Sequence, residues 1–215
     1  MAQNTFDPTK FTTQKAKPLP VILLLDTSGS MNIVTNPNDV RDTGQTGFVD
    51  GQQVRFVEGG ITRIASLNSS VKKMLNTFSR FERDSTEILV SIITFGADTR
   101  MVIPPTSASN VGFADLQASG DTPLGRGLGI AKGLIEDKNQ IPSRAYRPLV
   151  VLVSDGMPND SWQGPLADFI QNGRTAKCDR MALAISDEAD RNMLAQFIEG
   201  TGREVFNADT AEQIT

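Results

Sequence analysis

The stretch Leu23-Leu24-Leu25-Asp26-Thr27-Ser28-Gly29-Ser30-Met31 decides the fold, because an apolar run ends within it abruptly on a carboxylate. The run reaches back to Val21, and such a series predicts a strand buried on both faces. Open α/β sheets bind ligands at the carboxyl ends of their strands, which is where Asp26 lies. With Asp26, the hydroxyls of Ser28 and Ser30 offer the oxygen ligands that a hard cation such as Mg²⁺ prefers. A solvated turn whose serines cap the next helix is the alternative interpretation.

The composition is that of one globular domain, and it excludes several kinds of site. The 215 residues are 39% hydrophobic and 21% charged, with a formal net charge of −4, so no general attraction to nucleic acid or anionic membranes is expected. The absence of histidine and the single cysteine, Cys178, exclude histidine-based catalysis, the usual zinc sites and intrachain disulfides. We see neither a signal peptide nor a membrane span, and we expect a cytoplasmic protein.

Strands and helices are expected to alternate along the chain. The patterns predict strands at 19–25, 87–95, 148–154, 180–185 and 203–206, and helices at 61–82, 165–172 and 187–199. A short strand at 100–103, ended by Pro104-Pro105, is expected to lie antiparallel at one edge. Thr122 and Pro123 predict a further helix start, with Thr122 as the cap. The fold class is therefore α/β: a doubly wound, mostly parallel sheet flanked by helices, with one short antiparallel edge strand.

We divide the chain into an extended arm at 1–17 and a single domain at 18–215. The domain carries an insertion at 32–60, within which 47–57 is predicted to form a hairpin that turns at Asp50-Gly51. The insertion follows the Asp26 turn directly, so it should lie on the same face of the domain. Its acidic residues fit a solvated loop better than a second cation site; they are Asp39, Asp42, Asp50 and Glu58. The last residues, 209–215, read as the first turns of a helix.

A second carboxylate, Asp155, ends the strand at 148–154. In a doubly wound sheet the strand that follows the first half of the chain lies beside the first strand, which would bring Asp155 next to Asp26. Two carboxylates that lie so close need a cation between them, or one of them must be protonated. The helix start at Thr122 is expected at the same edge of the sheet.

The order Asp-x-Ser-x-Ser, then Thr122, then Asp155 resembles the metal-ion-dependent adhesion site (MIDAS) of von Willebrand factor A (vWA) domains, from about Pro18 to the end of the chain. Together, 23–31 and 154–162 are similar to the bacterial TerY-like branch, which is linked to tellurite resistance and stress operons. The insertion at 32–60 is longer than the usual link of that branch, and the C-terminal helix is short. The resemblance implies that Mg²⁺ or Mn²⁺ binds directly to three hydroxyls and, directly or through water, to two carboxylates; these ligands are Ser28, Ser30, Thr122, Asp26 and Asp155.

Three functions fit these residues. The first is a metal-dependent protein-interaction module whose partner supplies an Asp or Glu to the metal; kinase-like or phosphatase-like neighbours of TerY-like genes are the partners that the resemblance implies. The second is a metal-assisted hydrolase or phosphatase, but haloacid dehalogenase-like phosphatases need a second Asp where Ser28 stands. The third is a structural domain with a vestigial site. Trp162 is either an exposed anchor for a partner or a core residue, and we expect Cys178 to have a packing role.

Overall fold

The computed structural model describes residues 16–49, 52–82, 86–186 and 189–207, and within these the main sheet has six strands. Their order is β5-β4-β1-β6-β7-β8, and only β5 runs antiparallel to its neighbour. The strands are β1 (Lys17–Asp26), β4 (Thr86–Phe95), β5 (Arg100–Ser107), β6 (Leu149–Ser154), β7 (Asp179–Ala184) and β8 (Phe206–Asn207). This order confirms the predicted α/β class and its antiparallel edge strand.

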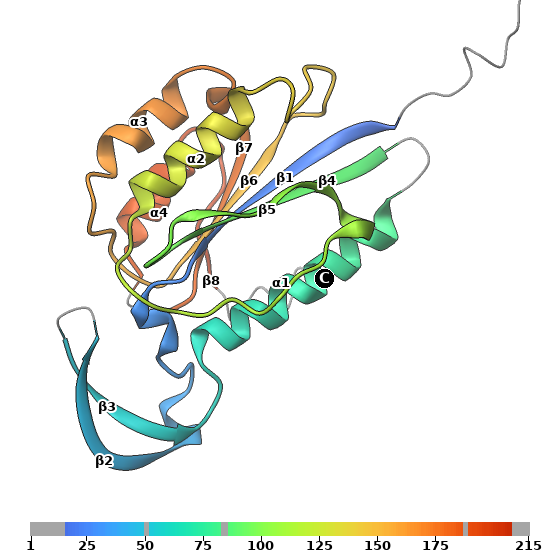
Figure 1. Cartoon of the computed structure of the whole chain (residues 1–215). Coiled ribbons are helices and arrows are strands. Elements are labelled where there is room, and N and C mark those ends of the chain that lie inside the picture. Colours follow the sequence, from blue (N-terminus) through green and yellow to red (C-terminus); the bar gives the residue numbers. More distant parts are fainter. Residues whose placement is uncertain (1–15, 50–51, 83–85, 187–188, 208–215) are drawn as a thin grey trace, which may run out of the picture.

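Helices cover both faces of the sheet, as Figure 1 shows. Helix α1 (Arg63–Phe81) covers one face, and α2 (Leu124–Glu136), α3 (Gln163–Gln171) and α4 (Arg191–Phe197) cover the other. Alternate residues of β1 enter the two cores: Ile22 and Leu24 pack with α2, α3 and α4, whereas Leu23 packs with α1. This two-sided burial is why the apolar run of β1 is continuous rather than alternating.

The prediction that Pro104-Pro105 ends the edge strand is wrong, because β5 continues to Ser107. The register shifts between the pairs Ile92–Ile103 and Val90–Thr106, so the two prolines lie in an irregular part of the ladder. Proline lacks an N–H donor, and an edge strand with a bulge leaves room for that loss. Further along, only Phe206 of the strand expected at 203–206 pairs with β7, and β8 continues to Asn207.

The insertion contains the predicted hairpin, which is longer than expected. Strands β2 (Val40–Val49) and β3 (Gln52–Gly59) pair antiparallel as a separate two-stranded sheet. Short 3₁₀ helices at Gly29–Asn32 and Pro37–Asp39 lead into it, and Figure 1 shows it projecting beyond the end of β1. The turn at Asp50-Gly51, the arm at 1–15 and the C-terminal stretch 209–215 lie outside the described residues.

A narrow neck joins this hairpin to the domain. Thr35 donates its backbone N–H to the carbonyl of Ile61 at 2.8 Å, and Val34 forms an antiparallel bridge with Thr62. Helix α1 begins directly after this neck, with the Thr62 hydroxyl as its cap. Ile61, which was expected on the packed face of that helix, instead lies outside it and is 62% exposed.

Candidate metal centre

The predicted metal ligands come from the carboxyl ends of neighbouring strands. Strand β1 lies between β4 and β6, and Leu25 of β1 is paired with Val153 of β6. Asp26 therefore ends β1 beside the end of β6, which Asp155 directly follows. The topology brings the two carboxylates to one edge of the sheet, as the doubly wound fold predicts.

Four of the five predicted residues form one continuous chain of hydrogen bonds. The backbone N–H of Ser28 donates to Asp26 Oδ1 at 2.9 Å. The hydroxyl oxygens of Ser28 and Ser30 lie 3.0 Å apart, and the Ser30 hydroxyl donates to Asp155 Oδ1 at 2.8 Å. Asp26, Ser28 and Asp155 are almost fully buried, whereas Ser30 is partly exposed. Solvent or a ligand therefore reaches the cluster from the Ser30 side.

Asp26 is a buried acid in an environment that disfavours its charge. Burial and the nearby negative charge of Asp155 raise the pKa of Asp26 to about 6. Hydrogen bonds from Ser154 and Ser28 act in the opposite direction, and the Ser154 hydroxyl donates to Asp26 Oδ2 at 2.6 Å. Both donors, Ser154 and Ser28, are neutral, so these hydrogen bonds leave the negative charge of Asp26 uncompensated.

Arg63 is a member of this cluster that the sequence analysis missed. Its Nη1 lies 2.9 Å from Asp155 Oδ2, and the side chains of Arg63 and Asp155 are 8% and 0% exposed. Arg63 is the first residue of α1, where the helix dipole disfavours a positive charge. That placement at a helix start, directly after the insertion, is the signal that could have identified Arg63.

Thr122 lies at the same edge, but its side chain is not part of the hydrogen-bonded chain. It is 5% exposed, and within the described residues its hydroxyl makes no hydrogen bond. Main-chain hydrogen bonds hold the preceding loop against the Asp26 turn: Gly29 N–H donates to Gly120 O at 2.8 Å, and Ser119 N–H donates to Thr27 O at 2.8 Å. The backbone that leads to Thr122 is therefore held against the Asp26 turn, and the Thr122 hydroxyl is not engaged by another described residue.

Gly120 allows this close approach of loops. Its φ of 76° belongs to the left-handed region, and a Cβ built on it would lie 2.6 Å from Cα of Ala97. Ala97 in turn donates its N–H to Ser119 O at 2.8 Å. A larger residue at 120 would strain the backbone and push the Thr122 loop outwards.

The expectation that Thr122 caps the following helix is wrong. Helix α2 begins at Leu124, after Pro123, and no side chain of the N-cap residue caps it. The Asp160 carboxylate takes this role, since it accepts from the backbone N–H groups of Gly125 and Arg126, both at 3.1 Å. The Thr122 side chain is consequently free of the capping task that the sequence pattern suggested.

The donors of this site fit a hard divalent cation. Three hydroxyls and two carboxylates are oxygen ligands, which Mg²⁺ and Mn²⁺ prefer over nitrogen or sulfur. Among the described residues no group of three or more His, Cys, Asp or Glu side chains could hold a metal, so any cation here depends on the hydroxyls. The Thr122 hydroxyl, which makes no hydrogen bond to another described residue, and the buried negative charge of Asp26 both fit such an ion.

Two other residues discussed in the sequence analysis, Trp162 and Cys178, pack in or against the core. Trp162 is partly buried and packs against the core formed by α2, α3 and α4, as one of its two interpretations held. Cys178 is 5% exposed, and burial raises the pKa of its thiol to about 12, which supports the expected packing role. In the insertion, the side chains of Asp39, Asp42 and Glu58 are exposed, as a solvated loop requires.

No helix in the described part of the chain combines the length and the apolar character that a membrane crossing requires.

Comparison with known proteins identifies a family and a fold. The model of the von Willebrand factor type A domain matches residues 21–215. The uncharacterized protein Rv2850c of Mycobacterium tuberculosis is 30% identical in an alignment of 157 residues that covers 68% of this chain. The match covers 23% of that relative, so this chain spans about a quarter of its length.

Two solved structures share the architecture. Proximal thread matrix protein 1 from the mussel byssus, solved with a zinc-occupied MIDAS motif, has a TM-score of 0.60 and 13% identity over 93% of this chain and 46% of its own. The manganese-loaded TRAP protein of Plasmodium vivax has a TM-score of 0.56 and 15% identity over 93% of this chain and 72% of its own. At these identities the likeness shows the fold, and both structures hold a divalent metal.

Proposed function

We propose that this chain, which belongs to the family of von Willebrand factor type A domains, is a protein-interaction module that works through Mg²⁺ or Mn²⁺. This family often mediates metal-dependent protein interactions. The observation that carries the proposal is the hydrogen-bonded chain from Asp26 through Ser28 and Ser30 to Asp155 at the carboxyl edge of the sheet. It gathers hard oxygen donors of the kind that Mg²⁺ binds.

The residues of the site would have two roles, which differ in charge. Ser28, Ser30 and Thr122 would supply neutral hydroxyl ligands, and Asp26 and Asp155 would supply negative charge, directly or through water. Hydroxyls leave the charge of a divalent cation incompletely neutralised, so the bound ion supplies an open position for an external carboxylate. We therefore propose that a partner protein provides an Asp or Glu to the metal.

The hairpin of β2 and β3 is well placed to contribute to partner choice. Its neck emerges between the 3₁₀ helix at Gly29–Asn32 and Arg63, both of which border the metal centre. Phe48 and Phe56 are 77% and 51% exposed on it, and aromatic side chains are frequent anchors of protein interfaces. A partner that reaches the metal from the Ser30 side would then also meet the hairpin.

We further propose a non-catalytic role in a cytoplasmic, TerY-like stress or tellurite-resistance system. Position 28, where an aspartyl phosphatase would need its second acid, is a buried serine that interacts with Ser30. The similarity of 23–31 and 154–162 to TerY-like proteins supports this branch, and it makes kinase-like or phosphatase-like proteins the first partners to test.

Calorimetric titration of the chelator-treated protein with Mn²⁺ and Mg²⁺ tests the metal. Thr122→Ala removes one hydroxyl without deleting a carboxylate, and we expect it to lower the affinity on the order of tenfold or more, the effect typical of a lost metal-site group. Thr77→Ala, a surface threonine of α1 whose hydroxyl bonds to Lys73 O, is the matched control and should bind as the unmodified protein does. Equal Mn²⁺ affinity in both variants would place the metal elsewhere.

Binding of the kinase-like and phosphatase-like candidates, measured with Mn²⁺ and with excess EDTA, tests the partner. We expect EDTA and Thr122→Ala to weaken the complex to a similar degree. A complex that survives both would contradict metal-mediated binding and point to the hairpin instead.

A further inference from the structure

We propose that a cavity at the amino edge of the sheet, opposite the metal centre, binds a small phosphate-bearing molecule. The cavity has a volume of about 730 Å³ and lies where β6 and β7 begin, bordered by Pro148 and Asp179. Six residues of β6 at about 3.3 Å each separate its two ends by about 20 Å, so this cavity and the metal centre are distinct. Ligand pockets commonly measure about 300–1,000 Å³, which suits a small organic molecule.

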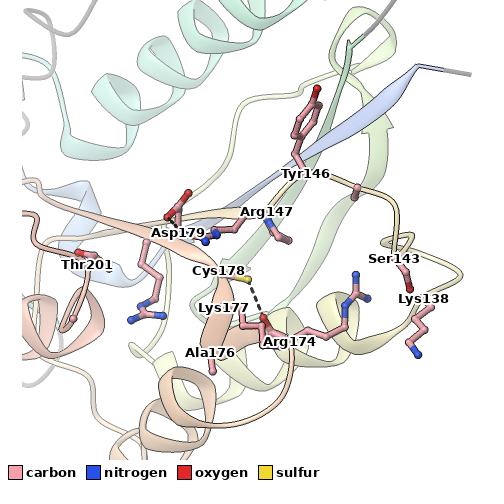
Figure 2. Close-up of a pocket in the computed structure, with 14 residues that line it drawn as sticks. Lys138, Ser143, Tyr146, Arg147, Arg174, Ala176, Lys177, Cys178, Asp179 and Thr201 are labelled. Atoms are coloured by element: carbon pink, nitrogen blue, oxygen red, sulfur yellow. Dashed lines mark hydrogen bonds and ion pairs between the residues drawn. The ribbon is translucent and has the colours of Figure 1, made fainter. Parts of the chain in front are cut away.

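The lining of the cavity is strongly positive although the chain as a whole is negative. Five cationic side chains line it, against the single carboxylate of Asp179: Lys138, Arg147, Arg174, Lys177 and Arg180. They come from four segments: the turn after α2, the loop before β6, the segment between α3 and β7, and the start of β7. Figure 2 shows several of them around one space. The formal net charge of the chain is −4, so this concentration of positive charge is local.

Within the described residues four of these cations form no ion pair, although the backbone N–H of Arg174 donates to the Glu136 carboxylate at 2.6 Å. Asp179 forms an ion pair with the fifth, Arg147, whose Nη1 lies 3.4 Å from Asp179 Oδ1; Figure 2 marks this pair. Across the described residues no carboxylate lies within ion-pair distance of the other four, Lys138, Arg174, Lys177 and Arg180. A charge without a counter-ion in a concave site attracts an anion from solution.

The two unpaired arginines are held in place by neutral groups. Arg174 donates to the carbonyls of Ile135 and Ile141, and Arg180 donates to those of Phe197 and Glu199, both at 2.8 Å. Carbonyls at helix ends orient a guanidinium and compensate its charge only in part. One donor remains on the buried Arg180, because its Nη1 has no acceptor among the described residues.

This arrangement favours phosphate over a simple carboxylate. A phosphate group carries more than one negative charge at neutral pH and presents several acceptor oxygens, which match guanidinium donors well. Burial lowers the pKa of Arg180, so its charged form lacks stabilisation that a bound anion would provide. The exposed ammonium groups of Lys138 and Lys177 would contact the parts of the ligand that remain in solvent.

Calorimetric titration with pyrophosphate and with inorganic phosphate tests the site. The buffer contains EDTA, so that the metal centre holds no cation and adds no phosphate site. We expect saturable binding, tighter for pyrophosphate because it carries more charge. Lys138→Gln and Lys177→Gln should each weaken it about threefold, as expected for exposed charges, and the double variant about tenfold.

Lys72→Gln is the matched control, since Lys72 is an exposed lysine on α1, across the sheet, where it pairs with Asp115. Its pyrophosphate affinity should equal that of the unmodified protein. All three lysines are on the surface, so the variants are expected to fold. The proposal is overturned if pyrophosphate does not saturate the protein, or if Lys72→Gln weakens binding as much as the cavity variants do.

Discussion

Replacing Arg63 by methionine tests the electrostatic account of the metal centre. The variant removes the guanidinium that lies 2.9 Å from Asp155 Oδ2 but keeps most of the side-chain volume. Both partners are buried, and breaking one side of a buried ion pair costs about 3–5 kcal/mol because the other charge is left unpaired. In a domain of this size about 1 kcal/mol shifts the melting temperature by about 2–4 °C. We therefore expect a loss of about 6–20 °C in EDTA.

Mn²⁺ should reverse part of that loss. Without Arg63, the site holds two carboxylates and no fixed cation, so a divalent ion is attracted more strongly than in the unmodified protein. We expect the Mn²⁺ affinity to rise at least tenfold, which corresponds to about 1.4 kcal/mol of additional metal-induced stabilisation at saturation. Differential scanning fluorimetry in EDTA and in Mn²⁺ measures both effects on the same samples.

Two further variants make the result specific to Arg63. Arg63→Lys keeps the charge and should recover part of the stability in EDTA. Arg55→Met breaks an exposed ion pair with Asp42, whose side chain is 50% exposed, and should cost under about 1 kcal/mol of stability. It should not change the rise in melting temperature that Mn²⁺ causes. The reasoning fails if Mn²⁺ raises the melting temperature of Arg63→Met by no more than it raises that of Arg55→Met.

Four other outcomes are predicted from the structure. Gly120→Ala places a Cβ 2.6 Å from Ala97 at a φ of 76°, so it should cost about 1–3 kcal/mol in denaturant titration and lower Mn²⁺ affinity. Gly129→Ala, in open space on α2, should instead stabilise by up to about 1 kcal/mol. Because burial raises the pKa of Cys178 to about 12, its reaction rate with a thiol reagent should still rise with pH at about pH 10; levelling near about 8.5 would contradict this burial. Replacing 36–60 by a two-residue turn should change the melting temperature little, since Thr35 and Ile61 already pair across the neck; collapse of the fold would make the hairpin part of the core.

The main features of the fold were predictable from local patterns. The continuous apolar run of β1 and its carboxylate indicated a central parallel strand, and the topology placed Asp155 beside Asp26 as expected. The continuation of β5 through Pro104-Pro105 was not predictable in the same way. Whether a proline ends a strand depends on whether its missing N–H faces a partner, and that is decided by tertiary pairing.

The site was predictable only where its residues follow strand ends. Thr122 was assigned as a cap because local sequence favours it, but Asp160, 38 positions later, caps α2 through contacts that no local pattern contains. Arg63 is 92 positions from Asp155, and the insertion between β1 and α1 obscures its relation to the site. Long-range pairs of this kind need the sheet order and the helix direction together.

Arg63 also bears on why the centre would favour a partner carboxylate. The guanidinium already neutralises one oxygen of Asp155, so the charge available to a cation comes from Asp26 and from the remaining oxygen, which Ser30 bonds. A divalent ion held by these groups and by neutral hydroxyls would retain excess positive charge. That excess is larger than in a site with two uncompensated carboxylates, so Arg63 would lower the affinity for the metal alone and raise the attraction for an external acid. Arg63→Met should accordingly bind Mn²⁺ more tightly and a carboxylate partner less tightly, and a change of both affinities in the same direction would refute this role.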